Sequence, residues 1–278
     1  MNDLVIACSS GYDWEVLKYW CNSLNRSGYT GKKVVIVISG TKDTLTKLID
    51  NGFEVIVNGL DQDGNPTSTE THLPPHVERF VHIYDYLSKN KFRYVVTTDI
   101  RDVIFQKNPI DWIEQNIEDK QFVFSSESML YKDEPWGDRN LLETFGAYFY
   151  EKYKNNEIFN VGVLAGKGDS ITSLCANIFV SCINKPIPIC DQSTFNFLIS
   201  QEPYLSVGKY TRSEDGWACQ LGTTADPNKI NHFRPFLLEQ SPKINQDKVV
   251  TSTGIEYNIV HQYDRVPEWN EILTNRYR

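Results

Sequence analysis

The segment at residues 94–106 reads YVVTTDIRDVIFQ, an apolar run that passes directly into a turn bearing two carboxylates. Residues 93–98 predict a buried strand, and Asp99 and Asp102 follow its carboxyl end. In open α/β sheets, ligands bind at the carboxyl ends of strands, near the point where strand order reverses. This segment therefore predicts a sheet and also the place of a functional site on that sheet.

Strand and helix patterns alternate along the residues before this segment. Apolar runs predict strands at 4–8, 33–38 and 53–57. Helical spacing of apolar residues predicts helices at 14–24 and 44–50, and a third helix that opens at Pro74-Pro75 and runs through Leu87. The clearest loop is DQDGNPTS at 61–68. Strands that alternate with helices predict a Rossmann-like α/β fold with a mostly parallel central sheet.

The carboxyl half has a less regular pattern. Helices are expected at 171–183 and from Asp191 through Leu198, and turns at Pro135-Trp136-Gly137, 166–169 and 225–228. We find no repeat and no linker poor in apolar residues. A single domain over 1–278 is therefore expected, with a carboxyl half that extends the same sheet.

Composition limits the partners. The chain has 36 acidic and 28 basic residues, and the resulting charge of -8 disfavours nucleic acid as a partner. A small anionic ligand remains compatible if a divalent cation or arginines neutralise it locally. No apolar stretch reaches the roughly 20 residues that cross a bilayer, and the amino terminus lacks a basic leader, so a cytoplasmic protein is expected. The six cysteines form no CxxC pair, which favours buried free thiols in a reducing compartment.

The two aspartates of the segment are candidate metal ligands. Carboxylates three residues apart on a turn repel each other unless a cation lies between them. Mg²⁺ and Mn²⁺ bind a few protein carboxylates and complete their shell with phosphate oxygens and water, so the pair suggests a metal that holds a diphosphate. The alternative is a solvated turn in which Arg101 pairs with its acidic neighbours.

The same string resembles the apolar strand and DxD signature of GT-A glycosyltransferases, in a DxRD variant, and the element order from Leu4 to Phe105 is similar to the nucleotide-binding half of that fold. Phe105 matches the aromatic residue that follows DxD, so the resemblance makes Asp102 the firmer metal ligand. The inserted residue leaves open whether Asp99 also binds the metal or approaches ribose, the sugar or a metal-bound water.

Two later strings extend the resemblance. NVGVLAG at 160–166 and DQSTFN at 191–196 look like the Asn-x-Gly strand and the DQxxxN helix start of glycogenin-like, family 8 retaining enzymes. The resemblance implies that Asp191 and Gln192 are catalytic residues that bracket the sugar, although Asp191 could equally be a helix cap. His261, in IVHQYDR at 259–265, matches the late histidine that supplies a third metal ligand; the alternative is a structural histidine. His72, His76, His82 and His232 match no motif.

Further residues are expected around a nucleotide-sugar donor. Arg79 resembles the basic residue that these enzymes aim at the donor sugar or phosphate; alternatively it is a surface arginine paired with Glu78 or Asp85. Tyr12 and Asp13 could stack on the base and meet its polar edge, or Asp13 could cap a helix. The expected donor-binding set is Tyr12, Asp13, Arg79, Asp99 and Arg101, and acceptor-side candidates are Glu127, Glu134 and Trp136.

The resemblance implies a glycosyltransferase that uses Mn²⁺ or Mg²⁺ to move a sugar from a nucleoside diphosphate to a carbohydrate or glycan acceptor, with a UDP-sugar favoured over a GDP-sugar. Residues 1–106 would bind the donor and 107–278 the acceptor, and retention of anomeric configuration is favoured. An inverting enzyme would need a carboxylate base, for which Asp191, Glu127 or Glu134 could serve.

Two other functions are compatible with an α/β sheet of this kind. A sugar-1-phosphate nucleotidyltransferase should carry a basic, glycine-rich loop after its first strand. Here that loop, SSGYD at 9–13, has one glycine and no Lys or Arg. A noncatalytic carbohydrate-binding protein of the same fold is the other alternative.

Overall fold

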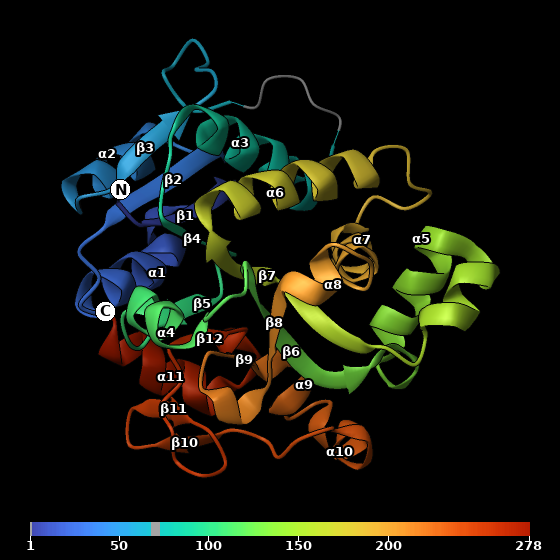
Figure 1. The fold of residues 1–278 in the computed structure, drawn as a ribbon. Helices are drawn as coiled ribbons and strands as arrows, with labels where there is room; N and C mark the ends of the chain where they lie inside the picture. Colours follow the sequence, from blue (N-terminus) through green and yellow to red (C-terminus); the bar gives the residue numbers. More distant parts are fainter. Residues whose placement is uncertain (1, 68–72) are drawn as a thin grey trace.

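The apolar runs of the amino half lie side by side in a seven-stranded sheet (Figure 1). The computed structural model describes residues 2–67 and 73–278, so Ser68 of the expected loop and His72 fall outside the described residues. The strand order is β3-β2-β1-β4-β7-β6-β8, and of these described strands β7 alone runs antiparallel to its neighbours. The strands are β1 (Leu4–Ser10), β2 (Lys32–Ser39), β3 (Glu54–Val57), β4 (Tyr94–Thr98), β6 (Phe122–Leu130), β7 (Glu157–Lys167) and β8 (Gly208–Thr211).

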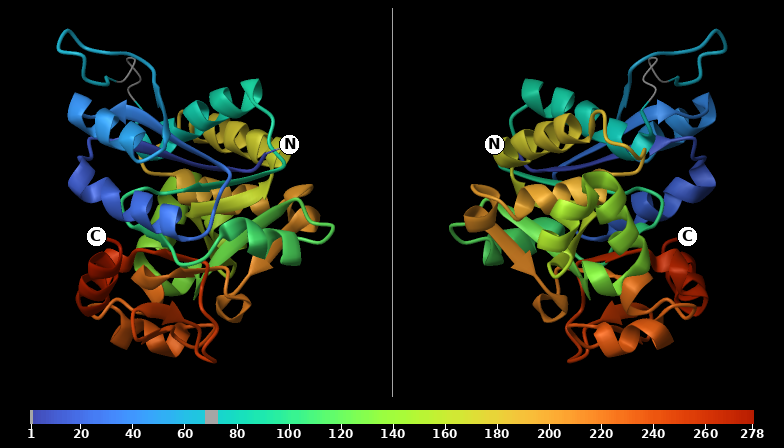
Figure 2. Two further views of the ribbon diagram at one scale, coloured as in Figure 1. Left: turned by 90° about the vertical axis from the view of Figure 1, so that its left-hand side faces the viewer. Right: turned by 90° about the vertical axis from the view of Figure 1, so that its right-hand side faces the viewer.

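Helices cover both faces of this sheet (Figure 2). Successive side chains of a strand point to opposite faces, and in β1 Leu4 and Ile6 enter one core while Val5 and Ala7 enter the other. The first core is closed by α3 (Pro75–Lys89), α6 (Gly168–Cys182) and α7 (Asp191–Ile199). The second is closed by α1 (Trp14–Arg26), α2 (Lys42–Asp50) and α4 (Pro109–Asn116). The predicted mostly parallel, helix-flanked sheet is confirmed.

The strand order reverses beside β1. This strand pairs with β2 on one side and with β4 on the other, so the chain leaves β1 in one direction and returns on the opposite side. A crevice opens outside the carboxyl ends of two such strands, where ligands of open α/β sheets bind. The loop after β1 and the turn after β4 both begin at this crevice.

A second sheet brings the end of the chain to that turn. It contains β5 (Val103–Phe105), β12 (Ile259–His261) and β9 (Ala218–Gln220), in the order β5-β12-β9. His261 pairs with Val103, the residue after Asp102. The carboxyl half extends the first sheet through β6, β7 and β8, as predicted. It also builds this separate sheet, which the sequence did not predict and whose far side packs against α11 (Pro267–Arg276).

Two predicted turns are wrong. Residues 135–137 open α5 (Pro135–Tyr153) because proline suits the first helical turn and the Glu134 side chain caps it, accepting from Gly137 N at 2.6 Å. β7 passes into α6 at Gly168 without a separate turn. Gly166 in this segment lets the backbone of β7 approach that of Gln121 closely, since a Cβ at Gly166 would lie 2.3 Å from Gln121 O. The turn at 225–228 and the helices that start near Ile171 and at Asp191 are confirmed.

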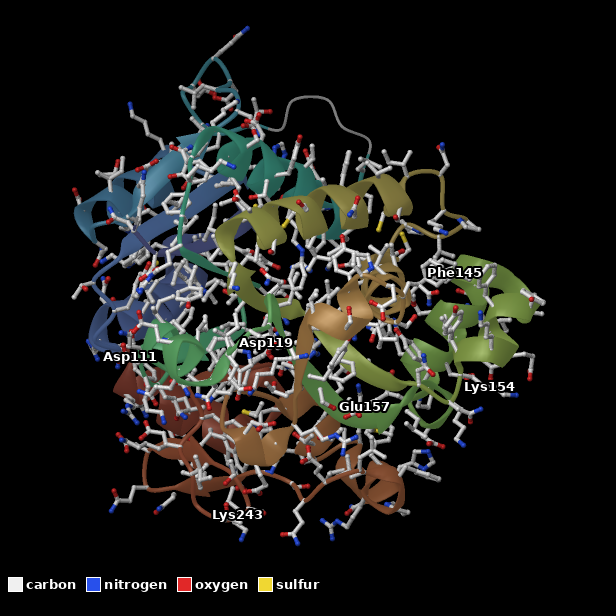
Figure 3. All side chains as sticks on the ribbon, in the orientation of Figure 1. Asp111, Asp119, Phe145, Lys154, Glu157 and Lys243 are labelled. Carbon is white, nitrogen blue, oxygen red and sulfur yellow. The ribbon has the colours of Figure 1, made fainter. Side chains whose placement is uncertain are left out.

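α5 lies at one edge of the molecule, where Figure 3 labels Phe145 on the helix and Lys154 directly after its end. Gly146 interrupts this helix with φ 78°, a left-handed value that glycine adopts readily. The remaining short elements are α8 (Tyr204–Val207), α9 (Leu221–Thr224), α10 (Ile230–Phe233), β10 (Lys243–Asn245) and β11 (Lys248–Val250). All six cysteines are free. Within 2–67 and 73–278, no helix combines the length and apolar character that crossing a membrane requires.

Candidate metal centre and cavity

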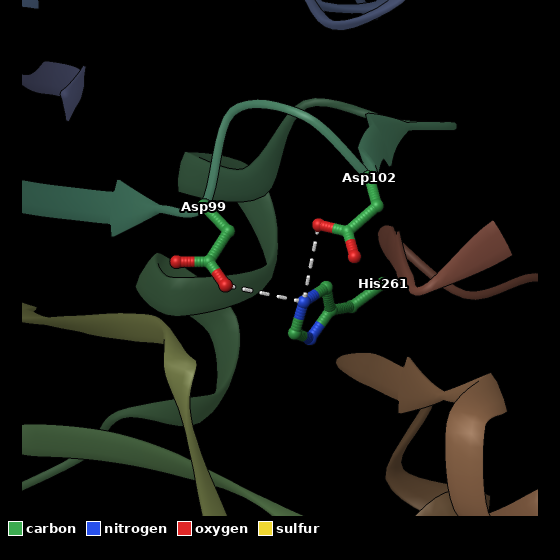
Figure 4. Close-up of side chains that lie close together, drawn as sticks. All are labelled: Asp99, Asp102 and His261. Carbon is green, nitrogen blue, oxygen red and sulfur yellow. Dashed lines mark ion pairs between the residues drawn. The ribbon is translucent and has the colours of Figure 1, made fainter. Parts of the chain in front are cut away.

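Asp99, Asp102 and His261 converge at the crevice (Figure 4). Asp99 directly follows β4, Asp102 directly precedes β5, and His261 ends β12, which pairs with β5. His261 Nε2 lies 3.5 Å from Asp99 Oδ2 and 3.5 Å from Asp102 Oδ1. One ligand atom from each residue falls within 4.8 Å of the others. The structure thus brings together the three residues that the sequence proposed as metal ligands.

A hydrogen-bond relay fixes which nitrogen of His261 carries the proton. The Ala218 carbonyl can only accept, so Ser125 Oγ donates to it at 2.9 Å. Ser125 has no second proton, so the Gln220 atom 2.9 Å away must be its donating amide nitrogen. The Gln220 oxygen then faces His261 Nδ1 at 2.7 Å and accepts its proton. In the neutral ring, Nε2 therefore presents a lone pair to the two carboxylates.

These three groups suit a divalent cation. Neighbouring ligands of an octahedral ion bound at about 2.1 Å lie about 3 Å apart, close to the 3.5 Å separations here. Two carboxylate oxygens and a neutral imidazole nitrogen match the preferences of Mn²⁺. Burial opposes ionisation of Asp102, whereas the Arg101 guanidinium 3.0 Å away favours the ionised form, and the pKa of this carboxyl lies below its usual range. Asp102 is thus kept in the form that binds metal.

Gly162 brings the backbone of β7 against the triad. A Cβ at this position would lie 2.6 Å from His261 Cε1 and 2.8 Å from Asp99 Oδ2, distances that real Cβ atoms do not adopt. Asp99 N also donates to Gly162 O at 2.8 Å. The glycine of the Asn-x-Gly string is therefore required by the close packing of the metal centre.

Arg79 links the metal centre to the start of α7. One guanidinium nitrogen pairs with Asp99, and the other lies 3.1 Å from Asp191 Oδ2. The Arg79 side chain is 12% exposed, so the alternative of a surface arginine paired with Glu78 or Asp85 is wrong. Asp191 has the Arg79 guanidinium as its partner and is 3% exposed. Three residues from distant parts of the sequence thus form one ionic chain.

A second carboxyl group is held by amides. Glu127 Oε1 accepts from Asn160 Nδ2 at 2.7 Å and from Gln192 Nε2 at 2.5 Å. The oxygens of both amides are held by backbone N–H groups of β7, that of Asn160 by Gly162 N at 2.6 Å and that of Gln192 by Val161 N at 3.0 Å. Because these contacts fix the orientation of both amides, both must donate to Glu127.

These groups line a cavity of about 650 Å³. Its walls include the predicted residues Tyr12, Arg79, Asp99, Arg101, Asp102, Asp191, Gln192 and His261, together with Glu127, Glu134 and Trp136. Arg101 also pairs with Asp102 at 3.0 Å and with Asp264 at 3.1 Å.

Asp13 does not line this cavity. It caps α1 by accepting from Val16 N at 3.1 Å, which agrees with the capping alternative.

The sequence did not single out several residues of the site. Ser125 and Gln220 are separated from His261 along the chain and share no spacing with it. Lys229 and Arg265 add positive charge to the cavity wall, but the sequence gives neither residue a role of its own. His76 also lines the cavity, whereas His82 and His232 do not. The spacing of these residues gives no signal, because only the folded chain brings them together.

No protein-family model matches the chain, and no curated protein matches its sequence. Function is therefore inferred from the chemistry of the cavity.

Proposed function

We propose that this chain is a divalent-metal-dependent glycosyltransferase of the GT-A type, which moves a sugar from a UDP-sugar to a carbohydrate acceptor. The observation that carries the proposal is the convergence of Asp99, Asp102 and His261 at the strand-order reversal, on the wall of a cavity of about 650 Å³. A volume of this size falls in the range of small-molecule and cofactor sites.

The residues around the triad suit an anionic donor. A bound Mn²⁺ or Mg²⁺ would neutralise the negative charge that develops on the departing diphosphate. Lys229 and Arg265 also line the cavity and add cationic groups to it, so it suits a diphosphate despite the net charge of -8. Tyr12 follows β1 at the crevice and offers an aromatic face to the base. Arg101 shares its charge with Asp102 and Asp264 and keeps further N–H donors for phosphate.

The start of α7 suits the transferred sugar. Asp191 and Gln192 both line the cavity next to the ionic chain through Arg79. The oxygen of Gln192 already accepts from Val161 N, and its nitrogen donates to Glu127. These contacts favour a role for Gln192 in positioning the sugar over a role in attacking it. Retention of configuration stays a proposal that rests on the resemblance.

Calorimetric titration of UDP and of GDP, each with Mn²⁺ and with chelator, tests this function. We expect UDP to bind in the presence of Mn²⁺ and to lose most of its affinity when the metal is removed. The nucleotide that binds is then carried into an assay of sugar-nucleotide hydrolysis. Folded protein that binds Mn²⁺ but neither nucleotide would overturn the proposal and favour a carbohydrate-binding role.

A further inference from the structure

Glu127 lies in β6 at a place where the pairing between β6 and β7 is irregular. Between Ser126 and Leu130, four steps along β6 oppose only two steps along β7, from Phe159 to Glu157. Bulges of this kind turn side chains away from their regular directions and are common beside active sites. Here the irregularity contains Glu127, and the side chain faces the cavity.

The β7 strand is irregular at the adjacent position. One step along β6, from Phe124 to Ser125, opposes four steps along β7, from Leu164 to Asn160. The extra β7 residues supply the backbone N–H groups that orient the amides of Asn160 and Gln192. Two bulges thus cooperate to hold one carboxyl group, which is more structure than a solvent-facing glutamate requires.

The two oxygens of Glu127 have different surroundings. Oε1 accepts from both amides. Oε2 has no hydrogen-bond partner among residues 2–67 and 73–278, yet it is not among their fully buried, unpartnered polar atoms, so it reaches the cavity. Glu127 itself is 5% exposed. A nearly buried carboxyl oxygen without a partner is costly, and a ligand that donates a hydrogen bond to it would remove that cost.

The hydrogen-bond partners of the Glu127 carboxyl group are neutral amides and include no cationic side chain of the described residues. Burial, with Glu134 as a second cause, raises the pKa of the Glu127 carboxyl, while the amides of Asn160 and Gln192 partly offset this. A hydroxyl group of a ligand can donate to the free Oε2.

Asn160 places Glu127 next to the metal centre. The Asn160 nitrogen donates to Glu127. The Asn160 oxygen, Asp99 Oδ2 and His261 Cε1 all lie within 2.8 Å of one point, the position that a Cβ of Gly162 would occupy. The sugar of a donor whose diphosphate lies at the triad would therefore be within reach of Glu127. We propose that Glu127 Oε2 accepts a hydrogen bond from a hydroxyl group of the transferred sugar and selects donors that carry it, an inference that rests on the proposed function.

Glu127→Gln provides a sharp test. Because Asn160 and Gln192 both donate to the Oε1 position, the new amide must place its oxygen there and its NH2 group at the Oε2 position. The substitution preserves the brace and converts the ligand-facing atom from an acceptor to a donor. Glu127→Ala removes both atoms and serves as the second variant, and Glu143→Gln, at an exposed glutamate on α5 paired with Arg139, is the matched control.

The measurement is calorimetric binding of UDP, UDP-glucose, UDP-galactose and their N-acetyl forms in Mn²⁺. We expect at least one UDP-sugar to bind wild type more tightly than UDP, and Glu127→Gln to reduce that advantage about 10- to 100-fold, as loss of a charge-assisted hydrogen bond does. Affinity for UDP itself should stay within about threefold of wild type. Deoxy analogues of the best donor then identify the hydroxyl, since one analogue should lose affinity for wild type but not for Glu127→Gln.

The two proposals fail in different ways. If no nucleotide binds, the glycosyltransferase function falls and the role of Glu127 falls with it. If UDP binds but no sugar adds affinity, or if Glu127→Gln weakens UDP and UDP-sugars equally, only the role of Glu127 is overturned. An equal loss in Glu127→Ala together with a lowered melting temperature would show that the carboxyl group is structural.

Discussion

Two walls of the cavity carry carboxyl groups, and their partners differ: cationic side chains at one wall and neutral amides at the other. At the triad, Asp99 and Asp102 are paired with the guanidinium groups of Arg79 and Arg101, and a histidine lone pair faces the same point. Across the Asn160 side chain, Glu127 is held by neutral amides. The first wall directs two carboxyl oxygens and a nitrogen at one point, whereas the second leaves one carboxyl oxygen without a partner.

The contrast teaches how one cavity can recognise two kinds of chemistry. Converging anionic ligands with charged partners create a place for a cation. A carboxyl group held by neutral amides keeps its geometry without adding positive charge, and by our proposal it recognises a hydroxyl group. We call the wall at Asp99, Asp102 and His261 the cation wall and the wall at Glu127 the hydroxyl wall. The following predictions test this division.

The largest effect is expected from Asp102→Ala. Asp102 is the less exposed of the two aspartates, with 8% of its side chain accessible against 31% for Asp99. Loss of a residue that only hydrogen-bonds a metal ligand typically costs about 10- to 100-fold in metal affinity. Loss of Asp102, a proposed ligand itself, should therefore weaken Mn²⁺-dependent UDP binding by more than about 100-fold. Calorimetry measures this, with Asp169→Ala as control at an exposed carboxylate. Retained binding in Asp102→Ala would show that the triad is not the metal site.

Gly162→Ala should be the next most damaging change. The added methyl group must displace His261 or Asp99, and overpacking of this kind costs about 1–3 kcal/mol. If that cost falls on the site, Mn²⁺ affinity should drop about 10- to 100-fold, which Mn²⁺ titration followed by electron paramagnetic resonance can measure. Gly40→Ala is the control because its Cβ meets no atom closer than 3.4 Å. Equal Mn²⁺ affinity in both variants would contradict the close packing described here.

Ser125→Ala should have a smaller effect on the same wall. It removes the hydroxyl that orients Gln220, so the amide no longer fixes the His261 proton on Nδ1. Loss of such a partner should lower Mn²⁺ affinity about tenfold. Thr211→Val removes another buried hydroxyl that donates to a backbone carbonyl, that of Phe124, without touching the relay. A similar loss of Mn²⁺ affinity in Thr211→Val would attribute the effect to general loosening of the sheet.

The smallest effect concerns the hydroxyl wall and the stability of the free protein. Folding raises the pKa of Glu127, so between the unfolded value near 4.5 and the folded value the native state binds more protons than the unfolded state. The contribution of Glu127 to stability therefore declines as pH rises through that window. Glu127→Gln lacks this titration, so its melting temperature relative to wild type should increase as pH rises above about 4.5, in chelator. A pH-independent difference would contradict the raised pKa.

The amino half could be predicted closely because its strands are buried on both faces and its helices are amphipathic. Runs such as β2 and the helical spacing of α1 record this burial directly in the sequence. The turn after β4 could be predicted as the place of a ligand site, since its polar residues directly follow an apolar strand. His261 could be named only through a resemblance, because 159 positions separate it from Asp102 and only the β5–β12 pairing joins them.

The rest of the site could not be predicted from local patterns. β6 contains the run Ser125-Ser126-Glu127-Ser128, which reads as a polar loop, yet all four residues are buried because the strand lies beneath the cavity and beside the second sheet. Gln220 matters through a contact with His261 across 41 positions. α5 was missed because Pro135-Trp136-Gly137 has turn composition and Gly146 interrupts its periodicity. Tertiary contacts decide each of these cases.

Gly162 has a consequence for how the two walls respond to each other. Its carbonyl accepts from the Asp99 backbone at 2.8 Å, and its N–H donates to the Asn160 side chain at 2.6 Å, so a single residue is bonded to both walls. If a metal and a sugar bind as proposed, displacement at one wall is transmitted to the other. Thermodynamic linkage then requires reciprocity. The factor by which the bound cation raises the affinity for the sugar equals the factor by which the bound sugar raises the affinity for the cation. The supply of either ligand would thereby set how much of the other the protein holds.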